Sequence, residues 1–454
     1  MADDPHDLLL RLRGALSTTP TASPRGYVRA LTGLAIRAAL PGARIGDLAI
    51  IERPASRGGP LACEVVGFGG ASPGSIDAGS SPSLEVVLMP LGALSGVGPD
   101  DAVILREGGG ELRPSIGWLG RVVDGLGRPI DGGPPLPLGA PAPIDRRPPG
   151  PLERKAIERP LQTSVRAIDA LLTVAEGQRV GLFAGSGVGK STLLGSIARG
   201  TAADAVVVAL VGERGREVKE FLERSLGDEG RKRACVVVAT SDAAALERLR
   251  AAQVATAIAE SLRDEGKSVL LLVDSITRFA RAQREIGLAA GEPPTRRGYP
   301  PSAFAVLPRL LERAGRGAVG SITAIYTVLI EGSDMEEPIA DEVRGVLDGH
   351  VVMDRAIAAR GRYPAVDVTV SLSRVMDQVV TREHRDAARA VRGLIGAFEA
   401  KRDLIALGAY AKGSDQAVDR AIAKMPAIDA LLSQHAEQRA TFDEAIAGLQ
   451  AIAR

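Results

Sequence analysis

The feature that most constrains this chain is the glycine-rich loop at residues 184–192, Ala-Gly-Ser-Gly-Val-Gly-Lys-Ser-Thr. An apolar run typical of a buried strand precedes it at 179–183, and a helical pattern follows it from Leu193 to Arg199. A glycine-rich turn between a strand and a helix presents backbone N–H groups and the positive end of the helix dipole to a polyphosphate. We therefore predict that the chain binds a nucleoside triphosphate at this P-loop.

Within the loop, each residue type has a predicted task. Lys190 is expected to reach the β- and γ-phosphates of ATP, and the Ser191 hydroxyl to bind Mg²⁺. The usual pattern begins with a glycine where this chain has Ala184, and a small residue still permits the tight turn. The residues predicted to contact the nucleotide are Gly185, Ser186, Gly187, Val188, Gly189, Lys190, Ser191 and Thr192.

Two further apolar runs end in carboxylates. Residues 205–211 lead into Glu213, and residues 268–273 lead into Asp274. The carboxyl ends of parallel strands meet at one edge of a sheet, so Glu213 there could polarise the attacking water. Asp274 fits the Walker B pattern, an acid that holds Mg²⁺ mostly through water. Alone, an acid such as Glu213 after a strand is more commonly a surface charge or a helix cap. Apolar runs that end in Asp are also common, but the upstream P-loop makes the Asp274 signal strong.

Composition excludes several classes of partner. The 454 residues carry 56 Lys and Arg against 55 Asp and Glu, a net charge of +1, so no global field attracts nucleic acid. Only 3% of residues are aromatic, which leaves few platforms for stacking bases, and we expect no nucleic-acid partner. No apolar stretch approaches the roughly 18 residues of a membrane span. Cys63 and Cys235 lie singly in apolar runs, as in reduced core residues, so we expect a cytoplasmic protein.

The pattern of apolar runs and turns predicts an α/β protein with additional domains at both ends. The alternation of strands and amphipathic helices indicates a parallel sheet in the central part. The predicted segments are a leucine-striped helix with a Ser/Thr/Pro linker (1–24), a small antiparallel β-barrel (25–113), a Gly/Pro-rich connector (114–151), the α/β core (152–380) and an alanine-rich helical domain interrupted at 408–415 (381–454).

Several long motifs occur in the same order as in a known family, and they lie at 160–169, 184–192, 212–218, 274–279, 291–302, 363–367 and 371–375. The chain resembles the type III protein-export ATPases, the flagellar and injectisome relatives of the catalytic subunit of rotary ATP synthases. The resemblance covers almost the whole chain. It implies a RecA-like P-loop core with a parallel sheet, an N-terminal β-barrel, a C-terminal helical domain and a homohexameric ring.

The resemblance also implies roles for individual residues. Glu213 matches the catalytic glutamate that positions water, and Arg214 matches a residue that helps hold the γ-phosphate. Arg374 matches an arginine finger that enters the nucleotide site of the neighbouring subunit; judged alone it is a surface charge. Tyr363 matches a tyrosine that packs on the adenine ring, although an aromatic that fills the turn before Pro364 is the alternative.

The implied function is Mg²⁺-dependent ATP hydrolysis that releases chaperones and drives export of unfolded substrates. The implied partners are other copies of the chain, a stator-like regulatory protein, a central stalk protein, export chaperones, secreted substrates and an export gate at the inner membrane, where the protein would dock peripherally. The helix at 7–16 would bind the stator-like protein or else pack on the chain's own barrel. The loop at 291–302 would face the central pore of the ring or else be a solvated loop.

Three other functions compete with export. A catalytic subunit of a rotary or V-type ATP synthase shares the core, but the forms of the P-loop and of 212–217 favour export, and the acidic helix pair that contacts the stalk in a synthase is not evident. A Rho-type RNA translocase is disfavoured by the neutral charge and low aromatic content. A ring subunit that does not hydrolyse ATP would lack Glu213. The choice between flagellum and injectisome stays open.

Overall fold

The computed structural model describes residues 24–69, 85–106, 112–330 and 334–454. These residues form two compact units, one containing a β-barrel and the other containing the parallel sheet and the C-terminal helices. The predicted helix at 7–16 lies outside the described residues. None of the described helices has the length and apolar character needed to cross a membrane.

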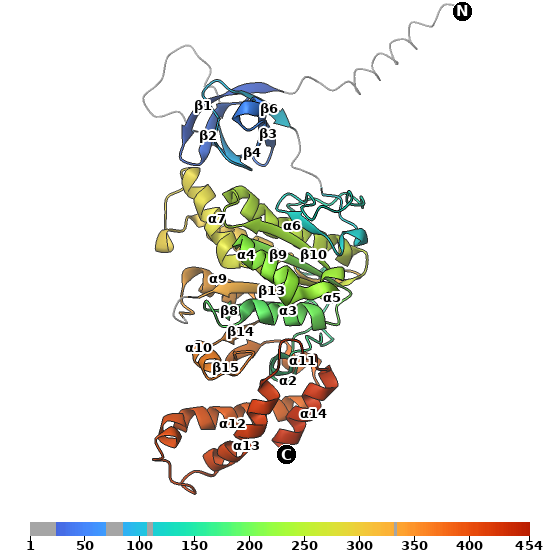
Figure 1. The fold of residues 1–454 in the computed structure, drawn as a ribbon, viewed down its shortest axis with the longest axis vertical. Coiled ribbons are helices and arrows are strands. Elements are labelled where there is room, and N and C mark those ends of the chain that lie inside the picture. The colour runs from blue at the N-terminus through green and yellow to red at the C-terminus, as the bar shows by residue number, and fades with distance from the viewer. Residues whose placement is uncertain (1–23, 70–84, 107–111, 331–333) are drawn as a thin grey trace, which may run out of the picture. The chain divides into compact units, whose positions relative to one another are not determined.

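The barrel is a closed sheet of six antiparallel strands (Figure 1). Its strands alternate between inward apolar and outward residues, so Val28, Ile36 and Leu88 are fully buried in the barrel interior. Around the barrel the order is β1-β2-β5-β4-β3-β6. The bounds are β1 (Arg25–Thr32), β2 (Ala35–Ala39), β3 (Leu48–Ile51), β4 (Leu61–Gly69), β5 (Glu85–Pro90) and β6 (Ala102–Arg106).

The second unit is built on a mostly parallel sheet with the order β15-β14-β8-β13-β11-β9-β10-β7. Among the described strands of this sheet, only β15, at the edge, and β12, beside β13, pair antiparallel. The central strands are buried on both faces, and every residue of the valine-rich β9 is buried. The bounds are β7 (Val122–Asp124), β8 (Arg179–Ala184), β9 (Ala205–Glu213), β10 (Ala234–Thr240), β11 (Ser268–Asp274), β12 (Gly315–Arg316), β13 (Ser321–Leu329), β14 (Gly349–Met353) and β15 (Val366–Ser373).

Part of the segment predicted as a connector belongs to this sheet. β7 pairs with β10 in parallel, through Val122, Val123 and Asp124. The two valines are buried there, because an apolar pair next to an open sheet edge is stabilised by extending the sheet.

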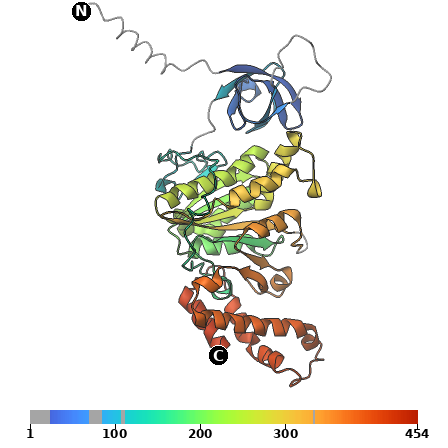
Figure 2. The ribbon, with the colours of Figure 1, turned by 180° about the vertical axis from the view of Figure 1, so that it is seen from behind.

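Helices cover the sheet (Figures 1 and 2). The longest of them, α6, packs against β9, β10 and β11. Proline at the first turn of α8 and α9 suits a helix start, where its missing N–H has no partner to lose. The bounds are α2 (Arg166–Leu171), α3 (Lys190–Gly200), α4 (Gly215–Glu220), the π-helical turn η3 (Phe221–Leu226), α5 (Gly227–Lys232), α6 (Ala245–Asp264), α7 (Ile276–Ala289), α8 (Pro301–Leu311), α9 (Pro338–Val346), α10 (Arg355–Ala359) and α11 (Met376–Val379).

The C-terminal region is a layer of three helices, α12 (Arg382–Ala406), α13 (Gln416–Leu432) and α14 (Phe442–Ala453), drawn in red in Figure 2. Each begins at a side-chain cap, namely Thr381, Asp415 or Thr441. All three helices contact α2, which also contacts β15 and so joins the layer to the sheet. Barrel, parallel sheet and C-terminal helices together confirm the predicted fold class.

Candidate functional site

The P-loop connects β8 to α3 at the carboxyl end of the sheet. Gly187 and Gly189 have φ values of +82° and +90°, in the left-handed region that favours glycine. The first residue of α3 is Lys190, and the exposed Ser191 follows it. The loop lines a cavity of about 660 Å³ together with residues from β9, α4, η3 and α7. The structure therefore places the predicted phosphate loop at a cavity large enough for a polyphosphate.

Lys190 lies between the two predicted carboxylates. Its ammonium forms an ion pair with Oδ1 of Asp274 and lies 3.6 Å from Oε1 of Glu213. The Thr327 hydroxyl, on β13, donates to the same Asp274 oxygen at 2.7 Å. Because β8, β13, β11 and β9 are successive neighbours, their carboxyl ends bring these four side chains together.

Arg278 of α7 completes this cluster, and the sequence reasoning did not single it out. Its guanidinium donates to the carbonyl oxygen of Gly212 and lies 3.2 Å from Oε2 of Glu213. Gly212 has a φ of +69°, and a β-carbon there would lie 2.9 Å from Cδ of Arg278. The close approach therefore depends on glycine at 212. The available sequence signal was an arginine four residues after Asp274.

Within this cluster, Glu213 has a shifted pKa, and only 8% of the residue is exposed to solvent. Burial and then the charge of Asp274 raise the pKa of Glu213 to about 7, against the opposing charge of Lys190. A hydrogen bond that protonated Glu213 donates to Glu217 adds to the increase, and the charge of Arg278 opposes it. A carboxylate with a pKa near neutrality is suited to accept a proton at physiological pH.

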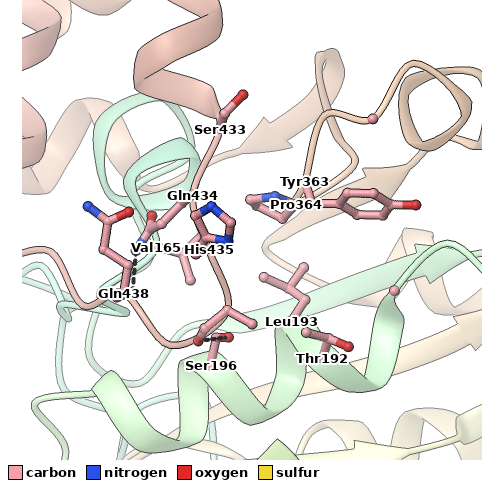
Figure 3. A pocket seen from close by; sticks show the side chains of 13 residues that line it. Val165, Thr192, Leu193, Ser196, Tyr363, Pro364, Ser433, Gln434, His435 and Gln438 are labelled. Carbon is pink, nitrogen blue, oxygen red and sulfur yellow. Dashed lines mark hydrogen bonds between the residues drawn. The ribbon is translucent and has the colours of Figure 1, made fainter.

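A second cavity, of about 380 Å³, lies next to the phosphate cavity and shares Gly189, Thr192 and Ala436 with it. Figure 3 shows Tyr363 and Pro364 on one side, residues of 433–438 on the other, and Leu193 and Ser196 of α3 along it. Such an apolar-walled pocket suits a nucleotide base.

The segment 433–438, between α13 and α14, was not predicted to contribute to the site. It is held there by hydrogen bonds to the core. The Gln434 N–H donates to the Tyr363 carbonyl oxygen at 2.8 Å, and the Ser196 hydroxyl donates to the Ala436 carbonyl oxygen at 2.9 Å. Ser196 and Ala436 are 240 residues apart in sequence, so no local pattern could have signalled this contact.

The two predicted arginines have different positions. Arg214 is exposed at the rim of the phosphate cavity and pairs with Glu217 at 3.7 Å. Arg374 directly follows β15, and Ser373 pairs with Gly349 at the start of β14, whereas Met353 at the other end of β14 pairs with Ala184. Arg374 therefore lies at the amino-terminal ends of the parallel strands, whereas its own P-loop lies at their carboxyl ends. Its side chain is exposed.

The donors present fit a magnesium site. The Ser191 hydroxyl is exposed on the P-loop, and the Asp274 carboxylate ends β11 at the same sheet edge. Mg²⁺ prefers oxygen ligands and is commonly held by one or two protein groups with substrate phosphates supplying others.

Comparison with known proteins places these features in a family. Residues 164–373 match the nucleotide-binding domain of the ATP synthase alpha/beta family, and residues 380–451 match the C-terminal domain of the T3SS EscN ATPase. The flagellum-specific ATP synthase of Bacillus subtilis is 49% identical over 430 residues, which cover 94% of each chain.

Solved structures agree with this placement. The assembled ATPase EscN from the type III secretion system of enteropathogenic E. coli matches with a TM-score of 0.86 at 43% identity, over 94% of this chain and 100% of that chain. The same ATPase in complex with its central stalk EscO matches with a TM-score of 0.84 at the same identity and coverage.

The predicted P-loop site thus lies in a chain that matches these relatives over nearly its whole length, and its C-terminal region matches the C-terminal domain of the T3SS EscN ATPase. The chain belongs to the type III secretion and flagellar export ATPases of the ATP synthase alpha/beta family, and it is an ATPase.

Proposed function

We propose that this ATPase hydrolyses MgATP as a homohexameric ring, and that hydrolysis releases chaperones from export substrates and drives the unfolded substrates into a type III export apparatus. The observation that carries the proposal is the division of the site. Lys190, Glu213 and Asp274 meet at one edge of the sheet, whereas Arg374 lies at the opposite edge.

The division favours a ring. When a chain has a phosphate site on one face and an arginine on another, the arginine of one copy can meet the phosphate site of the next only by head-to-tail association. Such association forms a closed ring when the rotation between copies allows it. In this arrangement Arg374 would enter the phosphate site of the next subunit, where its charge would oppose the charge that develops on the γ-phosphate.

The remaining residues have roles that follow from their positions. Lys190 would neutralise the β- and γ-oxygens, Glu213 would orient the attacking water and accept its proton, and Arg214 at the rim would contact the γ-phosphate. The P-loop backbone would hold the phosphates, and Tyr363 would pack on the adenine. Ser191 and Asp274 would hold Mg²⁺, which when bound supplies positive charge beside the phosphates.

The partners that we propose are inferred from the relatives of this chain. The structure of EscN with its central stalk EscO supports a central stalk protein as a partner of this chain. We further propose binding to a stator-like regulatory protein, to export chaperones and secreted substrates, and to the export gate, with the protein docked peripherally on the cytoplasmic side of the inner membrane.

The raised pKa of Glu213 predicts the pH dependence of turnover. A proton acceptor must be ionised, and a pKa of about 7 means that Glu213 is mostly protonated below that pH. We therefore expect kcat/KM for ATP to rise about tenfold per pH unit below about 7 and to level off above it. A steady-state assay from pH 5.5 to 9 at constant ionic strength measures this profile.

The control is the Glu213→Gln variant, because phosphate groups of ATP also titrate near this range. The residual turnover of Glu213→Gln should lack the rise that Glu213 causes. If the variant shows the same rise as the wild type, the titrating group is not Glu213.

Chaperone release provides the test of the export function. A cognate export chaperone loaded with a fluorescently labelled substrate is bound to the ring, and ATP is added. We expect substrate release with ATP, and no release with a non-hydrolysable analogue or with the Glu213→Gln ring, because release requires hydrolysis. Equal release by Glu213→Gln would separate release from hydrolysis and contradict the proposal.

A further inference from the structure

The backbone at Arg374 is fixed although its side chain is exposed. The Arg374 N–H donates to the Asp348 carbonyl oxygen at 3.0 Å. The preceding Ser373 hydroxyl donates to the Thr173 carbonyl oxygen at 2.8 Å and accepts from Nε2 of Gln178 at 3.2 Å. Gln178, which is fully buried, also donates to the Asp348 carbonyl oxygen at 3.2 Å. The backbone of Arg374 is therefore fixed to residue 348 by hydrogen bonds.

Asp348 is in turn held by Arg179, the first residue of β8. Nε of Arg179 lies 3.0 Å from Oδ2 and Nη2 lies 3.0 Å from Oδ1, and the Arg179 N–H donates to Oδ2 at 3.1 Å. A bidentate arginine with an added backbone donor fixes both the position and the orientation of a carboxylate. Nη1 of Arg179 also lies 2.5 Å from Oε2 of Glu312, so Arg179 has two acidic partners.

The strands meet closely at this point because residue 349 is glycine. A β-carbon on Gly349 would lie 2.6 Å from the Leu372 carbonyl oxygen. The backbone that follows Asp348 thus contacts the backbone that precedes Arg374 without an intervening side chain. A displacement of Asp348 would therefore be passed directly to Arg374.

We propose that Asp348, held by Arg179, is a positioning residue that sets the place from which Arg374 reaches the neighbouring subunit. This inference rests on the proposed role of Arg374 in trans. An arginine side chain has several rotatable bonds, so it arrives in the reactive geometry only if its Cα is fixed. A misplacement of 1 Å at a reacting centre can cost about 10²-fold in rate.

One strand, β8, contacts the residue that positions Arg374 at its start and leads into the P-loop at its end. β8 begins at Arg179, beside Asp348, and ends at Ala184, which leads into the P-loop. The positioning pair is thus part of the central sheet, whose buried strands hold geometry more accurately than a surface loop does.

The test is Asp348→Asn, which places an amide N–H₂ against the guanidinium and weakens the bidentate contact. We expect kcat to fall about 10-fold to 100-fold, while the Kd for ATP stays within about twofold because the chain's own P-loop is intact. Mixing Asp348→Asn with Lys190→Ala should restore turnover, because the Lys190→Ala subunit brings an undisturbed Arg374. A defect inside the P-loop of the Asp348→Asn subunit would not be rescued in this way.

Three further variants make the test specific. Glu312→Gln removes the other acidic partner of Arg179 without touching Arg374, so its kcat should remain near wild type.

In single-turnover assays, Asp348→Asn should cause no further loss in an Arg374→Ala background, because both changes act through one group. If Asp348→Asn does not fold, Ser373→Ala removes the hydroxyl contacts with Gln178 and Thr173 beside Arg374 and should lower kcat less, again without changing Kd.

The outcomes separate the two proposals. If Arg374→Ala lacks turnover but Asp348→Asn and Ser373→Ala turn over normally, the positioning role is wrong and the trans role stands. A kcat loss for Glu312→Gln equal to that of Asp348→Asn, or an additive loss in the double variant, also overturns positioning. If Arg374→Ala itself has the wild-type rate, the trans role is wrong.

Discussion

Replacing Arg374 with alanine is expected to lower turnover by about 10³–10⁵-fold, the contribution of arginine fingers in related phosphoryl-transfer enzymes. The Kd for ATP should change by less than about tenfold, because the P-loop and Tyr363 of the same chain are untouched. The reason is geometric. Arg374 follows β15 at the end of the sheet opposite its own Lys190, so we expect its charge to act only in the site of a neighbouring subunit. Steady-state turnover and nucleotide binding are measured on assembled protein.

Mixing two inactive variants tests the trans assignment directly. Lys190→Ala subunits keep Arg374, and Arg374→Ala subunits keep the P-loop, so mixed rings contain some complete sites. We expect partial recovery of turnover in the mixture and none in either variant alone. A double variant, Lys190→Ala with Arg374→Ala, mixed with Lys190→Ala is the matched control, since no complete site can form. Absence of recovery in verified mixed rings would contradict a trans role.

Assembly should also limit the wild-type enzyme. Specific activity is expected to rise with protein concentration through the range in which rings form, because a lone subunit lacks the neighbouring arginine. Full activity of a strictly monomeric preparation would contradict the same assignment.

The second large effect is expected at Glu213. Glu213→Gln should lower kcat at least about 100-fold, the usual scale for loss of a general base. ATP binding should persist, because glutamine keeps the size of the side chain and an oxygen that can accept from Arg278. Rapid-mix turnover and equilibrium binding of ATP to the variant separate these two properties.

Glu223→Gln provides a matched control for that loss. Glu223 lies in η3, is exposed and pairs with Lys219 at 3.8 Å, so removing its charge should leave kcat unchanged. Turnover of Glu213→Gln near the wild-type rate would remove Glu213 from the mechanism.

Some of the protein could be predicted from sequence because the signals are local. The P-loop needs a strand, glycines with positive φ and a helix start within a few residues, and all of these occur at 184–192. Glu213 and Asp274 each end a buried valine- or leucine-rich strand, so a parallel sheet brings them to the same edge. The fold class follows in the same way from runs of alternating strands and helices.

Only the tertiary structure determined which distant residues complete the site. β13 lies between β8 and β11, although it comes later in the chain than both, and this order brings Thr327 to Asp274 across 53 residues. The segment 433–438 lines the cavity beside Tyr363, where hydrogen bonds to α3 and to Tyr363 hold it. Arg374 is separated from its own P-loop because β15 runs antiparallel to β14. Strand order and direction depend on long-range packing, and no pattern within a short stretch of sequence encodes them.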